Sequence, residues 1–266
     1  MQRLITGLII GAAWLGLLLY APPLLFGLAV CLLAALALHE YGAMFYRQPA
    51  EAAFSPLFIV LGLLPVTGAV GGNPLWAMAG VVAGLLGLGL LTIFSYQRWP
   101  EPARFLATGA FGLLYPALLA AHLTLLIHLP EGRAWLVLLM VVTVGSDSGA
   151  YYVGTRWGRH KLCPAVSPGK SWEGYAGGLV TALAGVLLVG WLFFPDINRL
   201  QLLFFAFILT QVGVIGDLLE SILKRGTGVK DSGALLPGHG GILDRIDSLL
   251  LAAPVLYYLL LFGHGK

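Results

Sequence analysis

The sequence predicts an all-α polytopic integral membrane protein with about nine transmembrane helices. Of the 266 residues, 59% are hydrophobic and only 10% are charged, and the mean hydropathy is +0.89, which is far from the composition of a soluble domain. The apolar residues also form continuous runs of about 20 residues, the length that a helix needs to cross a bilayer. These runs lack the polar alternation of transmembrane barrel strands.

Polar residues, proline and glycine separate nine apolar runs along the chain. The first run follows Arg3 and resembles the apolar part of a signal peptide, but no small-x-small cleavage site precedes Pro22 and Pro23. We therefore expect this run to be a membrane anchor. The nine expected spans are 4–20, 22–45, 54–70, 75–95, 104–128, 134–154, 174–194, 201–219 and 247–262.

The basic residues indicate how these spans are oriented. If the N-terminus is cytoplasmic, Arg133, Arg199 and Lys266 lie on the outer side, and the other twelve of the 15 lysines and arginines lie on the cytoplasmic side. Such an excess marks cytoplasmic loops. We expect the N-terminus and two long polar loops, 155–173 and 220–246, to be cytoplasmic, with the C-terminus on the opposite side.

The composition also excludes other classes of protein. No basic, aromatic-rich soluble segment is present, so the net charge of +3 does not indicate a nucleic-acid partner. Cys31 lies in a span and Cys163 lies in a loop, so we expect neither a disulfide nor a thiolate metal site. We expect residues 1–130 to be scaffold helices and residues 131–266 to carry the functional side chains, within one integrated membrane domain.

Two features stand out in the scaffold half. Gly80, Gly84 and Gly87 form a small-residue face of the kind that lets membrane helices pack closely. Glu40 lies near the cytoplasmic end of the second span, where a charged side chain can extend to the membrane surface. We expect this surface position for Glu40, and a role in a site stays open.

Asp147 lies inside the sixth span, in the segment TVGSDSGAYY. An ionised carboxylate at the centre of such a helix costs about 2.5–3.5 kcal/mol, so another group must compensate for it. A hydrogen bond to a serine or tyrosine of a neighbouring helix is one explanation. The adjacent Ser146, Ser148 and Gly149 favour the other, in which Asp147 faces a polar cavity that contains an ion.

The loop after the sixth span contains the segment SPGKSWEG. Ser167, Pro168 and Gly169 favour a turn with free backbone N–H groups, and Lys170 adds a cation beside them. This combination is typical of an anion-binding site. The spacing is not that of a P-loop, so the segment does not indicate one.

Asp217, Glu220, Ser221 and Lys224 form a polar helical face at the end of the eighth span. They recur at i, i+3, i+4 and i+7, which places them on one side of a helix that continues this span. The side chains of this face include two carboxylates and one cation. The pattern therefore predicts a polar surface where the helix leaves the membrane.

Asp244, Asp247 and Ser248 form a second polar face, at i, i+3 and i+4, where the ninth span begins. The preceding PGHGG contains glycines that let the chain double back and approach a ligand closely. Capping of the helix N-terminus is the simpler explanation for one acidic residue here, but it does not account for Asp217. We expect the two faces to meet in an active site at the cytoplasmic interface.

These side chains predict the chemistry of a metal-bound phosphate. Three carboxylates brought together repel one another, and such oxygen ligands suit a hard divalent cation such as Mg²⁺. We expect Asp217, Asp244 and Asp247 to bind this cation. Phosphate groups bound to a metal are commonly held by basic side chains, and those of this region are Lys224, Arg225, Lys230 and Arg245.

The run SILKRGTGVKDSGALLPGHGGILDRID, Ser221 to Asp247, resembles the signature of the phosphatidate cytidylyltransferases, also called CDP-diacylglycerol synthases. It contains the elements S-x-x-K-R, K-D, H-G-G and D-R-x-D in the order of that family. The segments GSDSGAYYVG and SPGKSWEG resemble two further blocks of it. The resemblance covers roughly residues 140–250 by specific motifs and the rest by hydrophobic organisation.

The resemblance implies a bacterial inner-membrane enzyme that converts phosphatidic acid and CTP to CDP-diacylglycerol and pyrophosphate with a divalent metal, for phospholipid biosynthesis. It places Asp217, Asp244 and Asp247 at the acidic positions that organise metal and triphosphate. We expect Lys224 and Arg225 to act with them in catalysis. The expected substrate-binding residues are Asp147, Ser167, Lys170, Ser221, Lys230, His239 and Arg245, with His239 touching a phosphate or a carboxylate.

Two other classes of function remain as alternatives. An ion-coupled transporter would explain Asp147 and Asp217 inside the membrane, but it leaves H-G-G and D-R-x-D without a role. Another lipid-phosphate enzyme, such as a polyprenol kinase or a phosphatidyl-alcohol transferase, is the second alternative. The D-G-x-x-A-R pattern that is typical of phosphatidyl-alcohol transferases is missing from this sequence. The sequence does not indicate the acyl-chain preference, the number of metal ions or whether the protein forms a homodimer.

Overall fold

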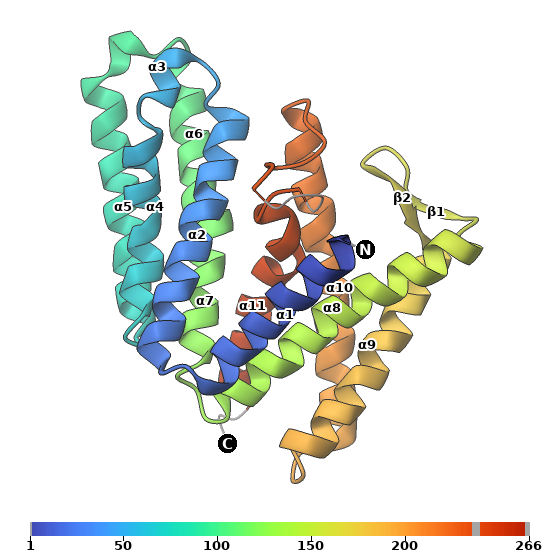
Figure 1. Ribbon diagram of the computed structural model, residues 1–266. Helices are drawn as coiled ribbons and strands as arrows, with labels where there is room; N and C mark the ends of the chain where they lie inside the picture. Colours follow the sequence, from blue (N-terminus) through green and yellow to red (C-terminus); the bar gives the residue numbers. More distant parts are fainter. Residues whose placement is uncertain (1, 236–239, 264–266) are drawn as a thin grey trace. The chain divides into compact units, whose positions relative to one another are not determined.

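The computed structural model describes residues 2–235 and 240–263. In these ranges the regular secondary structure is helical apart from one short hairpin, which confirms the all-α class (Figure 1). The elements of the first half are α1 (Gln2–Tyr20), α2 (Pro23–Phe45), α3 (Pro49–Ala52), α4 (Ser55–Ala69), α5 (Pro74–Phe94), η1 (Tyr96–Arg98), α6 (Pro102–Gly112), η2 (Leu113–Leu118) and α7 (Leu119–Leu126). Those of the second half are α8 (Gly132–Trp157), β1 (Lys161–Cys163), β2 (Ser167–Ser171), α9 (Trp172–Phe193), α10 (Arg199–Gly226) and α11 (Leu243–Gly263).

Seven helical segments within the described residues are long and apolar enough to cross a membrane. Two further apolar segments, Gly11–Tyr20 within α1 and the helix Ser55–Ala69, do not reach the length of a full span. The polytopic class is thereby confirmed, whereas the predicted number of nine spans is not. The seven segments are Pro23–Phe45, Pro74–Phe94, Pro102–Leu126, Gly132–Trp157, Trp172–Phe193, Arg199–Gly226 and Leu243–Gly263.

Proline and small polar residues determine where several helices begin. Helices α2, α5 and α6 each start with proline, whose fixed φ suits the first helical turn and whose missing N–H is not needed there. The side chain of Asn73 caps α5 by accepting from the N–H of Leu75, and Ser171 caps α9 by accepting from the N–H of Gly174.

The span Pro102–Leu126 contains an irregular turn. Its central part, η2, has π-helical hydrogen bonding around Pro116. Proline cannot donate to the carbonyl four residues earlier and its ring crowds that carbonyl, so the helix widens for one turn. The sequence predicted the span but not this local change.

The chain divides into two compact units. The first unit comprises residues 1–130 and 227–246, and the second unit comprises residues 131–226 and 247–266. The boundary between the units lies in α11, after Ile246. Asp244 therefore belongs to the first unit and Asp247 to the second. Residues 227–246 are grouped with the N-terminal helices although they are distant in sequence, which the sequence did not indicate.

In the first unit, α4 packs against α2 and α5. A Cβ on Gly80 would overlap the backbone of Leu64 and Pro65 in α4, and a Cβ on Gly87 would overlap the side chain of Leu61. The predicted close packing along this glycine face is therefore confirmed. The buried phenol of Tyr41 donates to the carbonyl of Thr108 at 2.9 Å and links α2 to α6.

In the second unit, α8 packs along α9, and α10 packs against both (Figure 1). Glycines allow the close approach of α8 and α9. A Cβ on Gly149 would lie 2.7 Å from the carbonyl oxygen of Gly177, and a Cβ on Gly178 would lie 2.6 Å from the carbonyl oxygen of Ser146. Backbone atoms cannot move aside as a flexible side chain can, so these positions have no room for a methyl group.

Gly149→Ala is therefore expected to destabilise the protein by about 1–3 kcal/mol, the usual cost of overpacking. Gly145→Ala is the matched control on the same face of α8, because its Cβ would meet Ala182 and Thr181 at an ordinary 3.8 Å. Alanine in a helix interior should leave stability equal or raise it by about 0.5–1 kcal/mol at this site. The midpoint of thermal unfolding in detergent measures the stability of both variants. Equal midpoints would contradict the close contact of α8 with α9 at Gly149.

The hairpin between α8 and α9 corrects one interpretation of the sequence. The segment SPGKS is not a turn but the extended strand β2, antiparallel to β1, with Lys161 opposite Ser171 and Cys163 opposite Ser167. The turn lies just before β2, where the N–H of Val166 donates to the carbonyl of Cys163 at 3.2 Å. In a two-stranded hairpin each strand has a free edge, and proline is tolerated in a strand at such an edge.

Candidate active site

Asp147, Asp217 and Asp247 come together in the second unit from α8, α10 and α11. Asp247 is only 7% exposed, and it interacts electrostatically with Asp217, Asp147 and Lys224. At the same level α10 and α11 touch, because a Cβ on Gly216 would lie 2.6 Å from the carbonyl oxygen of Asp247. Three of the acidic residues singled out in the sequence thus form one acidic cluster.

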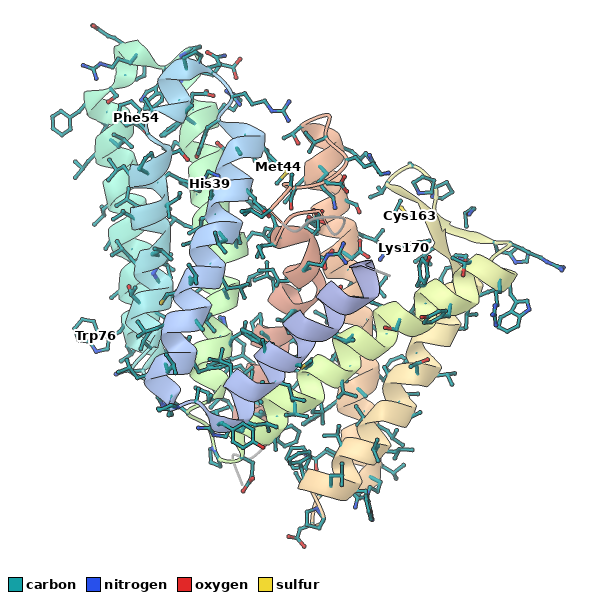
Figure 2. The ribbon with its side chains drawn as sticks, in the orientation of Figure 1. His39, Met44, Phe54, Trp76, Cys163 and Lys170 are labelled. Carbon is teal, nitrogen blue, oxygen red and sulfur yellow. The ribbon has the colours of Figure 1, made fainter. Side chains whose placement is uncertain are left out.

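Lys170, which is labelled in Figure 2, lies on β2 and reaches this cluster through Asp217. Its Nζ lies 2.5 Å from Oδ2 of Asp217, and the hydroxyl of Ser221 lies 3.5 Å from Oδ1 of the same carboxylate. The lysine and aspartate side chains are 23% and 30% exposed, so solvent reaches both and weakens their attraction. A cation and a carboxylate held at a solvent-accessible position suit an anionic ligand that arrives with its own cation.

The predicted polar face of α10 is present as well. Glu220 is fully buried, and its carboxylate pairs with Nζ of Lys224 one turn later at 2.5 Å. This pairing at i, i+4 partly neutralises a buried charge. Lys224 therefore interacts with Glu220 by direct contact and with Asp247 electrostatically.

The base of the hairpin is attached to α9 by Glu173. Its carboxylate accepts from the backbone N–H groups of Arg159 and His160, at 3.1 and 3.2 Å, and lies 2.6 Å from Nδ1 of His160. Ser171 caps the same helix. The hairpin that carries Ser167 and Lys170 is thus held at its base, which positions Lys170 beside α10.

Asp244 has a different environment, within the first unit. Its Oδ2 accepts from the N–H and the hydroxyl of Ser232, both at 2.9 Å, and from the N–H of Gly241 at 2.8 Å. Gly240 has a left-handed φ of 78°, which favours glycine, and turns the chain toward α11. Asp244 therefore organises the loop that precedes its own helix.

Comparison with known proteins identifies the family. Residues 1–262 match the profile of the cytidylyltransferase family. The chain belongs to this family. It is 36% identical to the phosphatidate cytidylyltransferase of Haemophilus influenzae over 98% of each chain. It is 38% identical to that of Pseudomonas aeruginosa over 97% of this chain and 96% of the relative. The family resemblance drawn from the motifs is thus confirmed.

The remaining candidate residues of this cytidylyltransferase family member are more dispersed. Ser167 is half-buried on β2, and Arg225 is exposed at the end of α10. Lys230 and Arg245 are exposed in the first unit. His239 lies outside the described residues, so its predicted contact with phosphate stays a prediction.

The donor set fits a hard divalent cation in part. Among the described residues, no group of three histidine, cysteine, aspartate or glutamate side chains is arranged to hold a metal ion. Mg²⁺, however, is usually bound through one or two carboxylates together with substrate phosphates and water. Asp217 and Asp247, which interact electrostatically, provide such a pair. Metal dependence stays a prediction of the sequence.

The sequence did not indicate Ser232, and it indicated the wrong position for Glu40. Ser232, which donates to Asp244, lies in the irregular segment between two helices, where no periodic pattern indicates a contact. Glu40 was expected at the membrane surface, but it is only 2% exposed, so that prediction was wrong. Like Asp147, Glu40 is a carboxylate in an apolar helix, and such a group needs polar partners.

Proposed function

We propose that this protein transfers the cytidylyl group of CTP to phosphatidic acid and so forms CDP-diacylglycerol and pyrophosphate. An oxygen of the phosphatidate phosphate forms a bond to the α-phosphorus of CTP. The bond from that phosphorus to the bridging oxygen of the β-phosphate breaks, and the electron pair leaves with pyrophosphate. Family membership and the names of the full-length relatives support this reaction.

The observation that carries the proposal is the cluster of Lys170, Asp217 and Asp247. It combines a cation at 2.5 Å from a carboxylate with a second, buried carboxylate that interacts with the first. A triphosphate and its counter-cation need both kinds of partner, since the phosphate oxygens bind cationic side chains and the metal binds carboxylates. Lys170 and Lys224 hold and orient the phosphates, with Ser167 and Arg225 of the same unit as further contacts.

The attacking group needs little help from a base, because a phosphate oxygen is already an anion at neutral pH. Catalysis by this chain therefore rests on orientation and electrostatic stabilisation. Asp217 and Asp247 would hold Mg²⁺, which when bound neutralises the charge that develops on the departing pyrophosphate. Asp147 completes the acidic side of the cluster.

We place the reaction at the cytoplasmic face of a bacterial inner membrane. Twelve of 15 basic residues fall on that side in the orientation given above, and CTP is dissolved in the cytoplasm. Phosphatidate presents its headgroup at the same depth, so the two substrates meet without either leaving its solvent. An ion transporter or a polyprenol kinase is not favoured, because neither agrees with the cytidylyltransferase family.

Incubation of the purified protein in detergent with phosphatidic acid, Mg²⁺ and CTP labelled in its cytidine tests the proposal. We expect a labelled lipid and one pyrophosphate for each lipid formed. EDTA in excess is expected to abolish the product, and added Mg²⁺ to restore it. Labelled lipid formed equally well in EDTA would contradict the metal, and its absence under all conditions would contradict the function.

A further inference from the structure

Glu40 is buried in the first unit although its side chain is acidic. It lies near the end of α2, the helix that carries the labelled His39 and Met44 in Figure 2, and is 2% exposed. The N–H of Ile242 donates to its Oε1 and the N–H of Leu243 donates to its Oε2, both at 2.9 Å. Both carboxylate oxygens therefore accept from residues about 200 positions later in the chain.

These donors lie at the N-terminus of α11, which begins at Leu243. The first N–H groups of a helix have no partners within the helix, and they concentrate positive partial charge. A capping side chain usually comes from the residue just before the helix. Here the carboxylate of Glu40, on a different helix, takes that role. Glu40 thereby fixes the start of the helix that carries Asp244.

Ser232 connects Glu40 to Asp244. Its Oγ lies 3.0 Å from Oε2 of Glu40 and 2.9 Å from Oδ2 of Asp244. A hydroxyl has one proton to donate, so it serves one of these carboxylates at a time. Ser232 is 5% exposed, and hydrogen bonds shielded from water in this way are stronger than exposed ones.

Two glycines leave the space that this contact needs. A Cβ on Gly233 would lie 2.5 Å from Oε1 of Glu40, and a Cβ on Gly241 would overlap Oε2 of Glu40 and Oγ of Ser232. The backbone of the loop therefore lies directly against the carboxylate. Gly241, the last glycine of H-G-G, serves the contact with Glu40, a role that the sequence did not indicate.

We propose that Glu40 is a positioning residue for the cytidylyl transfer. Through Ser232 and the first N–H groups of α11, its carboxylate orients Asp244 of the D-R-x-D signature, a residue that the sequence assigns to the metal and the triphosphate. This inference rests on the proposed function. Glu40 acts through other residues, because donors of the protein already occupy both of its oxygens.

Glu40→Gln preserves the shape of the side chain and removes an acceptor. Whichever way the amide is turned, its NH₂ group faces a donor of the loop. We expect kcat to fall about 10- to 100-fold, the effect of a displaced catalytic group, while the KM values for CTP and phosphatidate stay within about threefold. Ser232→Ala is a smaller change that should also lower kcat. In the double variant, the fold loss of kcat should be smaller than the product of the two single losses.

Hydrogen exchange of residues 241–243 is a second readout that does not depend on activity. In Glu40→Gln we expect these amides to exchange about 10-fold faster or more, because opening of the loop becomes easier. Glu51→Gln is the matched control: Glu51 is also a buried glutamate of the first unit, 1% exposed, but it pairs with Arg104. This control is expected to lower thermal stability without changing kcat or exchange at residues 241–243.

The outcomes separate a positioning role from a structural one. A wild-type kcat in Glu40→Gln, or a loss of kcat no larger than that in Glu51→Gln, would overturn the proposal. Unchanged exchange at residues 241–243 would overturn it as well. If the wild-type protein forms no CDP-lipid, the proposed function itself fails, and the exchange experiment still decides whether Glu40 holds the loop.

Discussion

Asp247→Asn is expected to lower kcat/KM about 10²- to 10⁴-fold while the protein remains folded and inserted. The substitution preserves the shape of a side chain that is 7% exposed and removes its negative charge. That charge interacts with Asp217, Asp147 and Lys224, the cluster to which we assign the metal and triphosphate. Loss of one group that stabilises developing charge commonly has an effect of this size.

The same variant is expected to be more stable than the wild type when metal and substrate are absent. Like charges repel one another, and a buried charge loses the hydration that it has in water. Asparagine removes both costs at position 247, and we expect a gain of about 0.5–2 kcal/mol in the free energy of unfolding. Mg²⁺ should raise the unfolding midpoint of the wild type and not that of the variant, because a ligand stabilises only a protein that binds it.

Asp196→Asn is the control for this experiment. Asp196 belongs to the same unit but is exposed in the connection between α9 and α10. Its replacement should leave activity, stability and the response to Mg²⁺ unchanged. Asp247→Asn with more than about a tenth of the wild-type activity would remove Asp247 from the reaction, since the loss expected from a group at the reacting centre is far larger.

Gly216→Ala is expected to impair both folding stability and activity. The added Cβ would lie 2.6 Å from the carbonyl oxygen of Asp247 and 3.2 Å from Cα of Ser248. Because these are backbone atoms, α11 must shift away from α10 at the level of Asp217. We expect a loss of about 1–3 kcal/mol in stability and about 10-fold or more in kcat, since displacement of catalytic groups by about 1 Å can have larger effects.

Gly213→Ala is the matched control on the same helix, one turn earlier. Its Cβ would meet Cβ of Ser248 at 3.6 Å, an ordinary contact. We expect wild-type activity and equal or slightly higher stability, because alanine favours a helix interior over glycine. Thermal unfolding measures the stability of both variants, and the CTP assay measures their activity. Equal activity in Gly216→Ala and Gly213→Ala would show that the approach of α10 to α11 at Gly216 is not needed for the reaction.

The local part of the candidate site was predictable because helical periodicity is local. The spacing of Asp217, Ser221 and Lys224 placed them on one face of α10, and the structure confirms the contacts along this face. The apolar runs predicted the helices for the same reason, since a segment in lipid must satisfy its backbone groups internally. The strand at Ser167–Ser171 was missed because Ser, Pro and Gly favour a turn, whereas pairing with β1 holds them extended.

Contacts between distant segments were not predictable from these patterns. No periodicity relates Lys170 to Asp217 or Glu40 to Ile242. Both pairs depend on where helices pack, and packing depends on close contacts such as that of Gly216 with Asp247. A single sequence shows the small residues that permit such contacts, but not which surfaces they bring together.

By itself the sequence determined that this is a helical membrane protein, that its polar residues gather at the ends of α10 and α11, and that its motifs are those of a cytidylyltransferase. Only the tertiary structure decided that Asp247 joins Asp147 and Asp217, and that Glu40 and Ser232 hold Asp244. Composition and periodicity reflect the solvent around each segment. A hydrogen bond or an ion pair requires two groups to meet within about 3 Å, and for segments far apart in the chain the fold decides which groups meet.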